Sequence, residues 1–308
     1  MDETKKEIVF EGVATAIVTP FNSDYSINFE KFGELIDYQI KGGVSAVVVC
    51  GTTGESATLS TKEKLELIRF AVEKAKGRIK IIAGTGSNNT ETAIYLSKEA
   101  EDLGADALLV VTPYYNKCNQ EGLYEHYKKI ASSVTIPILL YNVPSRTSVN
   151  ILPETTIKLS KIKNIVGIKE AKDDLVQIAE IIAKTDESFS VYSGNDNLTL
   201  PILALGGKGV ISVVSNIMPK EMVFLCNSYF NSNLIKARST NSKLLDIMND
   251  LFIDVNPIPV KEAMNTLGFD VGPVRLPLTN MQTDKYIKLN DTLQKYDLNI
   301  INKNSNND

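Results

Sequence analysis

Short apolar runs alternate with segments of helical periodicity along most of the chain. The first run, GVATAIVTP, begins at Gly12 and is followed by a helical pattern from about residue 29 to residue 41, which Gly42 and Gly43 end. Seven further pairs follow, with the apolar runs SAVVVC, KIIAGTG, DALLVVTPYY, IPILLYNVP, NIVGIK, SFSVYSG and KGVISVVSN. Alternation of strands and helices predicts a parallel sheet. Eight such units predict an α/β fold of the closed (β/α)8 TIM barrel type.

An open, doubly wound sheet is the alternative architecture. Such sheets contain about five to seven strands, and the dinucleotide-binding type carries a G-x-G-x-x-G motif after its first strand. No such motif follows the first apolar run here. The barrel is therefore the preferred prediction, and we assign residues 1–231 to it.

The second helix of the barrel is marked at both ends. Ser60 and Glu63 have the spacing of a capping box, in which each side chain binds the other residue's backbone N–H. Leu65, Ile68 and Val72 then fall on one helical face. The sequence thus predicts a helix that starts after Ser60 and ends at the glycine in position 77.

The strand pattern stops after about residue 231. Three helices are predicted by LIKARSTNSKLLDIMNDLF, PVKEAMNTL and TDKYIKLNDTLQKY. We expect residues 232–300 to form a C-terminal helical extension that packs on the barrel and could offer a partner surface. The polar tail INKNSNND, residues 301–308, is expected to be disordered.

The composition is typical of a soluble globular protein, and the small net charge favours an enzyme that acts on a small molecule. A net charge of −4 and the lack of any Lys/Arg-rich run argue against a nucleic-acid or membrane surface. No apolar run approaches the ~20 residues that a membrane span needs, and the N-terminal segment MDETKKEIVFEG lacks the apolar core of a signal peptide. We therefore expect a cytoplasmic protein without nucleic-acid or membrane partners.

Histidine and cysteine, the usual ligands of transition metals, are sparse in this chain. Cys50, Cys118 and Cys226 show no C-x-x-C spacing, which fits a reducing cytoplasm and gives no metal signature. His126 is the only histidine, so a Ser-His-Asp triad or a His-ligated zinc site is disfavoured, and we expect a structural role for it. No metal site is predicted.

The sixth apolar run, IVGIKEA, carries a lysine, Lys169, at the end of a strand that is otherwise apolar. Desolvation disfavours the ammonium form of a buried lysine, and a neutral amine can attack a ketone to form a Schiff base. The alternative is that the side chain lies at a strand tip and extends into solvent, as most lysines do. The residue alone leaves both interpretations open.

Active sites of barrel enzymes lie at the C-terminal ends of the strands, and polar motifs gather there. They are GTTGES, GTG, TPYY, YNVPSR, KE and SGND, after strands two to seven in that order. Each has a simpler interpretation: GTTGES could be a turn and a helix cap, Tyr141 a rim aromatic, and Arg146 a solvated charge rather than a bidentate carboxylate partner. Their shared position nevertheless favours one site. Glu170, the residue after Lys169 along the strand, should point away from the barrel interior.

Five motifs, GTTGES, VTPYYNK, YNVPSRT, GIKEA and SGND, occur in the order and on the strands of the dihydrodipicolinate synthase family. The chain resembles that family from about Gly12 to about Leu278. The resemblance implies condensation of pyruvate with L-aspartate 4-semialdehyde in lysine and diaminopimelate biosynthesis. It implies no cofactor beyond a covalent Schiff base with pyruvate on Lys169, and a homo-oligomer, in this family a tetramer of paired dimers.

The resemblance also implies catalytic roles for four residues. Lys169 would form the imine with pyruvate. Tyr141 would shuttle protons for imine formation and for the later cyclisation. Thr52 would link Tyr141 to Tyr115 in a hydroxyl relay, and in this family the second tyrosine reaches in from a neighbouring subunit. Tyr115 therefore requires at least a dimer.

Four further residues are implied in substrate binding. Thr53 and the backbone at Ile211 would hold pyruvate, and Gly194 belongs to the same binding set. Arg146 would bind the carboxylate of aspartate 4-semialdehyde.

The chain departs from relatives that are inhibited by lysine. Those relatives bind lysine between subunits, at positions aligned with Ser56, Ala57, Thr61, Lys64, Asn88, Thr92 and Tyr114. They carry histidine at position 64 and glutamate at position 92. Thr92 cannot pair with the ammonium of the ligand, and Lys64 adds a like charge. We predict weak or absent inhibition by lysine.

Two other functions remain as alternatives. One is another pyruvate-dependent lyase or aldolase of the same superfamily, of the N-acetylneuraminate or 2-keto-3-deoxygluconate type. The other is a non-catalytic barrel that binds a keto acid, although such a sensor has no need of the hydroxyl relay formed by Thr52, Tyr115 and Tyr141.

Overall fold

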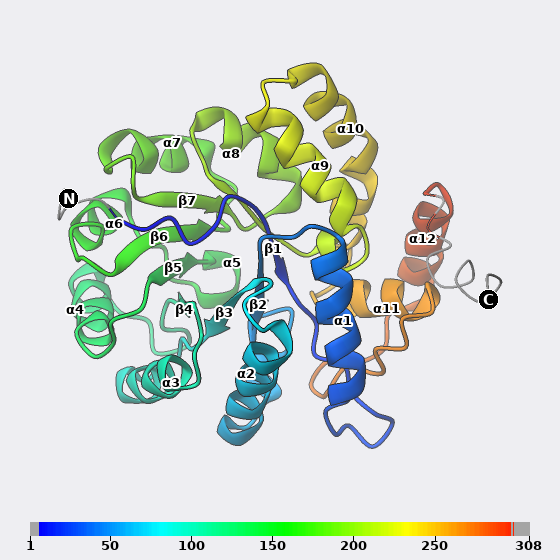
Figure 1. Ribbon diagram of the computed structural model, residues 1–308, viewed down its shortest axis with the longest axis horizontal. Coiled ribbons are helices and arrows are strands. Elements are labelled where there is room, and N and C mark those ends of the chain that lie inside the picture. Colours follow the sequence, from blue (N-terminus) through cyan, green and yellow to red (C-terminus); the bar gives the residue numbers. More distant parts are fainter. Residues whose placement is uncertain (1–5, 297, 299–308) are drawn as a thin grey trace.

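Eight parallel strands close into a barrel in this computed structural model, which describes residues 6–296 and residue 298 (Figure 1). The chain order is also the order around the barrel. The strands are β1 (Gly12–Ala16), β2 (Ala46–Val49), β3 (Lys80–Gly84), β4 (Ala107–Val111), β5 (Ile138–Asn142), β6 (Ile165–Glu170), β7 (Ser190–Ser193) and β8 (Gly209–Ser212). The predicted (β/α)8 barrel is confirmed.

Helices surround the strands, one or more after each strand (Figure 1). They are α1 (Phe29–Lys41), α2 (Thr61–Ala75), α3 (Thr90–Asp102), α4 (Gln120–Ala131), the single-turn α5 (Pro144–Thr147), α6 (Pro153–Leu159), α7 (Leu175–Lys184), α8 (Thr199–Leu205) and α9 (Pro219–Phe230). The predicted capping box is present at α2, where Ser60 accepts from the Glu63 N–H and Glu63 accepts from the Ser60 N–H.

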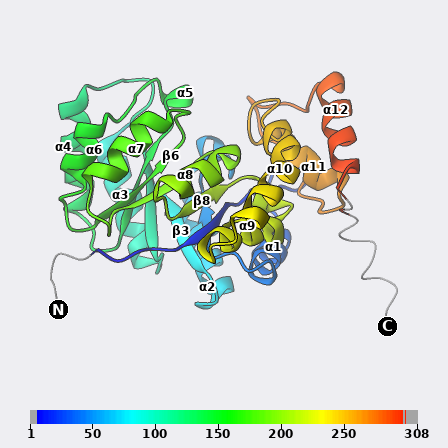
Figure 2. The ribbon, with the colours of Figure 1, turned by 90° about the horizontal axis from the view of Figure 1, so that it is seen from above.

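Three more helices follow the barrel: α10 (Leu234–Asp250), α11 (Ile258–Thr266) and α12 (Thr283–Gln294). They lie together at one side of the barrel, coloured gold to red in Figure 2. The three helices predicted for the C-terminal extension are therefore present. The tail at 301–308, together with residues 297, 299 and 300 of the extension, lies outside the described residues.

Apolar residues form two separate layers. The smaller cluster fills the barrel interior, with members from most strands: Ala14, Val48, Ile82, Leu109, Leu139, Val166 and Ile211. The larger cluster lies between the strands and the helices, with Val13, Val47, Ile81, Leu108, Leu140 and Ile168. Neighbouring residues of one strand thus divide between the two layers, as the alternation of side chains along a strand requires.

Strand β6 breaks this alternation once. Ile138 of β5 pairs with Ile165, but the next residue, Leu139, pairs with Gly167, so Val166 has no partner of its own. Val166 packs in the interior layer, whereas Ile168 packs in the outer layer. This β-bulge changes which residues of the strand face the interior: Val166 does so before the bulge, and Gly167 and Lys169 do so after it. Because of it Lys169 faces the interior; strict alternation from Val166 would turn it outward.

Candidate functional site at the carboxyl ends of the strands

Two adjoining cavities, of about 510 and 370 Å³, open at the carboxyl ends of the strands. Both are lined by Thr52, Tyr141, Val143, Arg146 and Asn256. A larger hollow of about 1010 Å³ lies at the amino ends of β5 and β6, far in the fold from these motifs. The chemistry predicted from the sequence thus collects around the first two cavities.

Lys169 is buried, with 5% of its surface exposed, and lines the first cavity. Its Nζ lies 4.4 Å from the centre of the Tyr141 ring, because the two residues are register partners on β5 and β6. The ring face stabilises the ammonium without occupying a hydrogen bond. The solvent-facing alternative for Lys169 is therefore wrong.

Asp196 is a buried carboxylate that lines the same cavity as Lys169. Its Oδ2 accepts hydrogen bonds from the backbone N–H groups of Val213, at 2.9 Å, and Val214, at 3.1 Å. Its Oδ1 has no partner among the described residues. Burial raises the pKa of Asp196, and the nearby charge of Lys169 opposes that shift. The carboxylate thereby fixes the loop after β8.

Thr53 is held by a residue from the C-terminal extension. The Nδ2 of Asn256 donates to the Thr53 Oγ1 at 3.0 Å, while the backbone oxygen of Asn256 accepts from Nη2 of Arg146 at 3.0 Å. The Oδ1 of Asn256 is buried without a partner among the described residues. Asn256 therefore joins the loop after β2 to the short helix α5.

Of the other predicted site residues, Gly194 lines a cavity, whereas Ile211 and Tyr115 do not. Gly194 lines the first cavity. An added Cβ would lie 2.6 Å from the Cβ of Ala171, so a side chain at this position would displace Ala171, which lines the same cavity. Ile211 is fully buried in the barrel interior and does not line either cavity with its side chain. Tyr115 is 93% exposed, with a φ of +70°, and does not line either cavity of its own subunit.

Glu170 lies on the opposite face of β6 from Lys169, in agreement with the prediction. Its carboxylate accepts from Asn142 Nδ2 at 2.9 and 3.0 Å, Gln177 Nε2 at 3.1 Å and the Lys172 N–H at 2.9 Å. Burial raises its pKa to about 7, against the effect of these hydrogen bonds. Glu170 thereby ties the end of β6 to β5 and to α7.

Several site residues were not identified from the sequence. Asn256 and three residues of α10 or its end, Met248, Asn249 and Phe252, line the first cavity. The C-terminal helices are thus part of the site wall, not only a surface outside it. Asp196 lies in the SGND motif, which was a visible signal; Asn256 lies in a short connection whose sequence carries no chemical pattern.

Among residues 6–296 and 298, no group of three or more His, Cys, Asp or Glu side chains could hold a metal ion. His126 is buried, accepts or donates at Nδ1 with the Thr90 hydroxyl at 2.9 Å, and has its pKa lowered to about 4 by burial. It lies on α4, away from both cavities. In the same part of the chain no helix has the length and apolar character that crossing a membrane requires.

Comparisons with known proteins agree with this arrangement. The profile of the dihydrodipicolinate synthetase family matches residues 9–296. The 4-hydroxy-tetrahydrodipicolinate synthase of Thermoanaerobacter sp. (strain X514) is 53% identical over 94% of this chain and 98% of the relative, and that of Bacillus subtilis (strain 168) is 50% identical over 93% and 99%.

A solved structure has the same fold. The crystal structure of dihydrodipicolinate synthase from Aquifex aeolicus superposes with a TM-score of 0.92 at 48% identity, over 94% of this chain and 99% of that one. The family predicted from the five motifs is confirmed, and this chain belongs to the dihydrodipicolinate synthetase family.

Proposed function

We propose that this chain condenses pyruvate with L-aspartate 4-semialdehyde to 4-hydroxy-tetrahydrodipicolinate, in lysine and diaminopimelate biosynthesis, through a Schiff base on Lys169. The observation that carries the proposal is the buried amine of Lys169 against Tyr141, in a cavity that also holds Thr52, Thr53 and Arg146. The identity to 4-hydroxy-tetrahydrodipicolinate synthases over nearly the whole chain supports this choice of substrates. We place the reaction in the cytoplasm.

The first step is attack of the Lys169 amine on the ketone of pyruvate. A carbinolamine forms, loses water and leaves a protonated imine. The departing hydroxyl needs a proton. Tyr141 is a register partner of Lys169 with its ring beside the amine, whereas the hydroxyl of the other register partner, Tyr192, is bound to the Phe10 oxygen. Tyr141 therefore acts as the proton donor and acceptor of this step.

The Tyr141 proton is exchanged through a relay of hydroxyl groups. Thr52 lines both cavities, as Tyr141 does. In our proposal its hydroxyl links Tyr141 to Tyr115. Since Tyr115 is almost fully exposed on its own subunit, we assign the relay position to the tyrosine of a second subunit. A homo-oligomer follows, at least a dimer and in our proposal a tetramer.

Pyruvate is held by Thr53, by Gly194 and by the backbone at Ile211. The loop after β8 is fixed by Asp196, so the carbonyl end of that strand is preorganised for the substrate. The buried carboxylate of Asp196 interacts electrostatically with Lys169, and we propose that it favours the positive charge of the imine.

Carbon–carbon bond formation follows from the electronics of the imine. The protonated imine acts as an electron sink, so a methyl proton is lost and an enamine forms. The enamine attacks the aldehyde carbon of aspartate 4-semialdehyde, whose carboxylate pairs with the exposed guanidinium of Arg146. The amine of the adduct then attacks the imine carbon, the ring closes, and Lys169 leaves as a free amine. No electron acceptor or metal takes part.

The test is an assay of purified protein with both substrates, coupled to reduction of the product. Condensation of pyruvate with aspartate 4-semialdehyde, with no cleavage of N-acetylneuraminate or 2-keto-3-deoxygluconate, supports the proposal. Cleavage of either sugar acid at a comparable rate assigns the chain to the alternative lyase function. Binding of pyruvate with no turnover of any of these compounds assigns it to the non-catalytic alternative.

A further inference from the structure

A buried ion pair connects the loop after β2 to α11. Nζ of Lys261 lies 2.9 Å from Oε1 of Glu55, and the two side chains are 2% and 1% exposed. The ammonium also donates to the backbone oxygens of Thr19, at 3.0 Å, and Pro273, at 2.5 Å, and lies 4.3 Å from the centre of the Phe21 ring. All three N–H groups of Lys261 are therefore used, and burial lowers its pKa.

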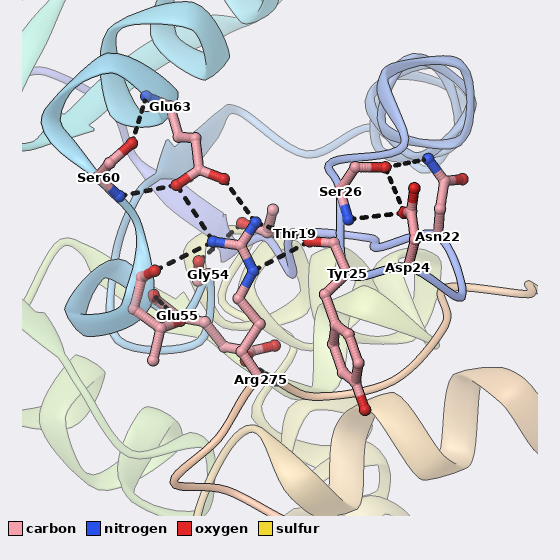
Figure 3. A network of polar contacts seen from close by, with 11 residues as sticks. Thr19, Asn22, Asp24, Tyr25, Ser26, Gly54, Glu55, Ser60, Glu63 and Arg275 are labelled. Atoms are coloured by element: carbon pink, nitrogen blue, oxygen red, sulfur yellow. Dashed lines mark hydrogen bonds and ion pairs between the residues drawn. The ribbon is translucent and has the colours of Figure 1, made fainter.

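The second oxygen of Glu55 is bound as well. Oε2 accepts from the backbone N–H of Arg275 at 2.8 Å. The guanidinium of Arg275 then reaches the Tyr25 and Thr58 backbone oxygens and the carboxylate of Glu63, the capping-box residue of α2 (Figure 3). This network joins three parts of the chain: the loop before α1, the start of α2 and the segment between α11 and α12.

Glu55 itself has a backbone conformation that needs support. Its φ is +55°, a left-handed conformation that is unfavourable for a residue with a Cβ. In this conformation the Glu55 N–H donates to the Thr52 oxygen at 3.1 Å, and the hydroxyl of Thr19 donates to the Gly54 oxygen at 2.7 Å (Figure 3). Strained residues of this kind persist where surrounding contacts over-determine them.

The tight turn so formed is the one that carries Thr52 and Thr53. The direction of both side chains depends on the turn, because Thr52 is its first residue and Thr53 its second. Thr53 receives the Asn256 amide from the segment that leads into α11, the helix that carries Lys261. The C-terminal extension thus holds the turn at two points.

Stability alone does not explain the pair. Removing two charges from water costs several kcal/mol per ion by order of magnitude, and apolar residues of similar size often replace a buried ion pair without loss of stability. What apolar residues cannot supply is the set of directed contacts that fixes a strained turn at a defined place.

We propose that Glu55 and Lys261 are positioning residues of the active site, which hold Thr52 and Thr53 in place through the turn after β2. The inference rests on the proposed function, since it concerns the pyruvate contacts and the hydroxyl relay of that reaction. Displacement of catalytic groups by about 1 Å can lower rates by on the order of 100-fold.

The test uses the neutral double variant Glu55→Gln/Lys261→Met, which leaves no unpaired buried charge. We expect a folded protein by circular dichroism and gel filtration, with kcat lowered by about 10- to 100-fold. The KM for pyruvate should rise more than the KM for aspartate 4-semialdehyde, because Thr53 lies in the turn itself, whereas Arg146 is connected to it only through Asn256. A merely structural role would lower the active fraction without changing the KM for pyruvate.

Two further variants keep the test decisive. Glu55→Asp retains both charges but shortens the side chain that carries the carboxylate. It should show the same change in kcat and KM, so it provides the test if the double variant does not fold. Lys295→Met is the matched control, since it removes an exposed lysine paired to Asp246 on α10 and should leave both KM values unchanged. Wild-type kcat and KM in a folded Glu55→Asp or double variant would overturn the inference.

Failure of the inference is distinguishable from failure of the proposed function. Borohydride reduction of wild-type protein with pyruvate reports on the Schiff base alone. Wild-type protein labelled at Lys169 together with unchanged variants contradicts only the positioning role. Absence of label in the wild type contradicts the proposed function.

Discussion

At the scale of single residues, Lys169 and Glu170 are adjacent in the chain but lie in opposite environments. Lys169 faces the barrel interior and the Tyr141 ring, whereas Glu170 faces the layer between β6 and α7. Their charges are therefore separated by the strand itself. Because of this separation, the proposed proton chemistry is assigned to Tyr141 and not to Glu170. Glu170 has a structural role instead, and its pKa of about 7 makes that role depend on pH.

Glu170 predicts a pH dependence of stability. Its pKa is raised to about 7 in the folded protein, so between about pH 4.5 and about pH 7 the folded state keeps a proton that the unfolded state has lost. Rising pH therefore favours unfolding over this window. Compared with the non-titrating variant Glu170→Gln, the wild type should lose about 2 kcal/mol of relative stability between about pH 5 and about pH 8.

Urea denaturation of both proteins at the two pH values measures this difference. Effects of all other titrating groups cancel in the comparison, because both proteins carry them. A stability difference that stays constant with pH would show that Glu170 does not titrate in this window.

At the scale of structural elements, the decisive feature is the bulge in β6. Gly167 takes the inward position opposite Leu139. A Cβ there would lie 2.4 Å from the Ser190 oxygen and 3.0 Å from Leu139 Cδ2. The absence of a side chain at Gly167 lets β5, β6 and β7 approach one another at the bulge. The bulge in turn directs Lys169 into the barrel interior.

Gly167→Ala should therefore destabilise the protein by about 1–3 kcal/mol, because backbone atoms must move to accept the methyl group. It should also lower kcat, since the displaced segment carries Lys169. Gly33→Ala on α1 is the control: its Cβ would meet only the Phe70 ring at 3.3 Å and the Lys74 side chain at 3.4 Å, and alanine favours helix. Equal thermal midpoints for Gly167→Ala and the wild type would refute this account of the bulge.

The elements were largely predictable from the sequence, but the contacts between them were not. Apolar runs marked all eight strands, and the Ser60–Glu63 spacing marked the start of α2. The bulge left no signal, because Val166 and Gly167 fit a regular apolar strand equally well. Asn256 and the Glu55–Lys261 pair were also invisible, since their partners are about 200 residues apart in sequence. Catalytic motifs are local, whereas the contacts that orient them are distant.

For the molecule as a whole, the position of Tyr115 bears on the proposed relay. Tyr115 is exposed on the loop after β4 and does not line the cavities that hold Tyr141 and Thr52. A site shared between subunits would restore it. Under the proposed function, catalysis would therefore depend on association of the chain with itself.

Mixing two inactive variants tests this link. Lys169→Ala subunits keep Tyr115, and Tyr115→Phe subunits keep Lys169. If the tyrosine acts across the interface, a mixed dimer contains one complete site, so activity should appear after the two proteins are unfolded together and refolded. Activity no greater than the sum of the separate variants would place Tyr115 outside the partner's site.

The residues around the second cavity include some of the positions at which lysine-inhibited relatives bind lysine. Lys64 lines that cavity with Ser56 and Tyr114, and burial lowers its pKa. Thr92 is exposed and carries no charge. We expect L-lysine at millimolar concentration to leave the condensation rate nearly unchanged, and the variant Lys64→His/Thr92→Glu to become more sensitive. A steep loss of wild-type activity at sub-millimolar lysine would contradict the prediction.

Borohydride reduction is the decisive experiment for the proposed Schiff base between Lys169 and pyruvate. Protein treated with borohydride in the presence of pyruvate is digested, and its peptides are analysed by mass spectrometry. We expect a reduced pyruvate adduct on Lys169 that forms only when pyruvate is present and is absent from Lys169→Ala. An adduct on another lysine, or no adduct in an active wild-type protein, would contradict it.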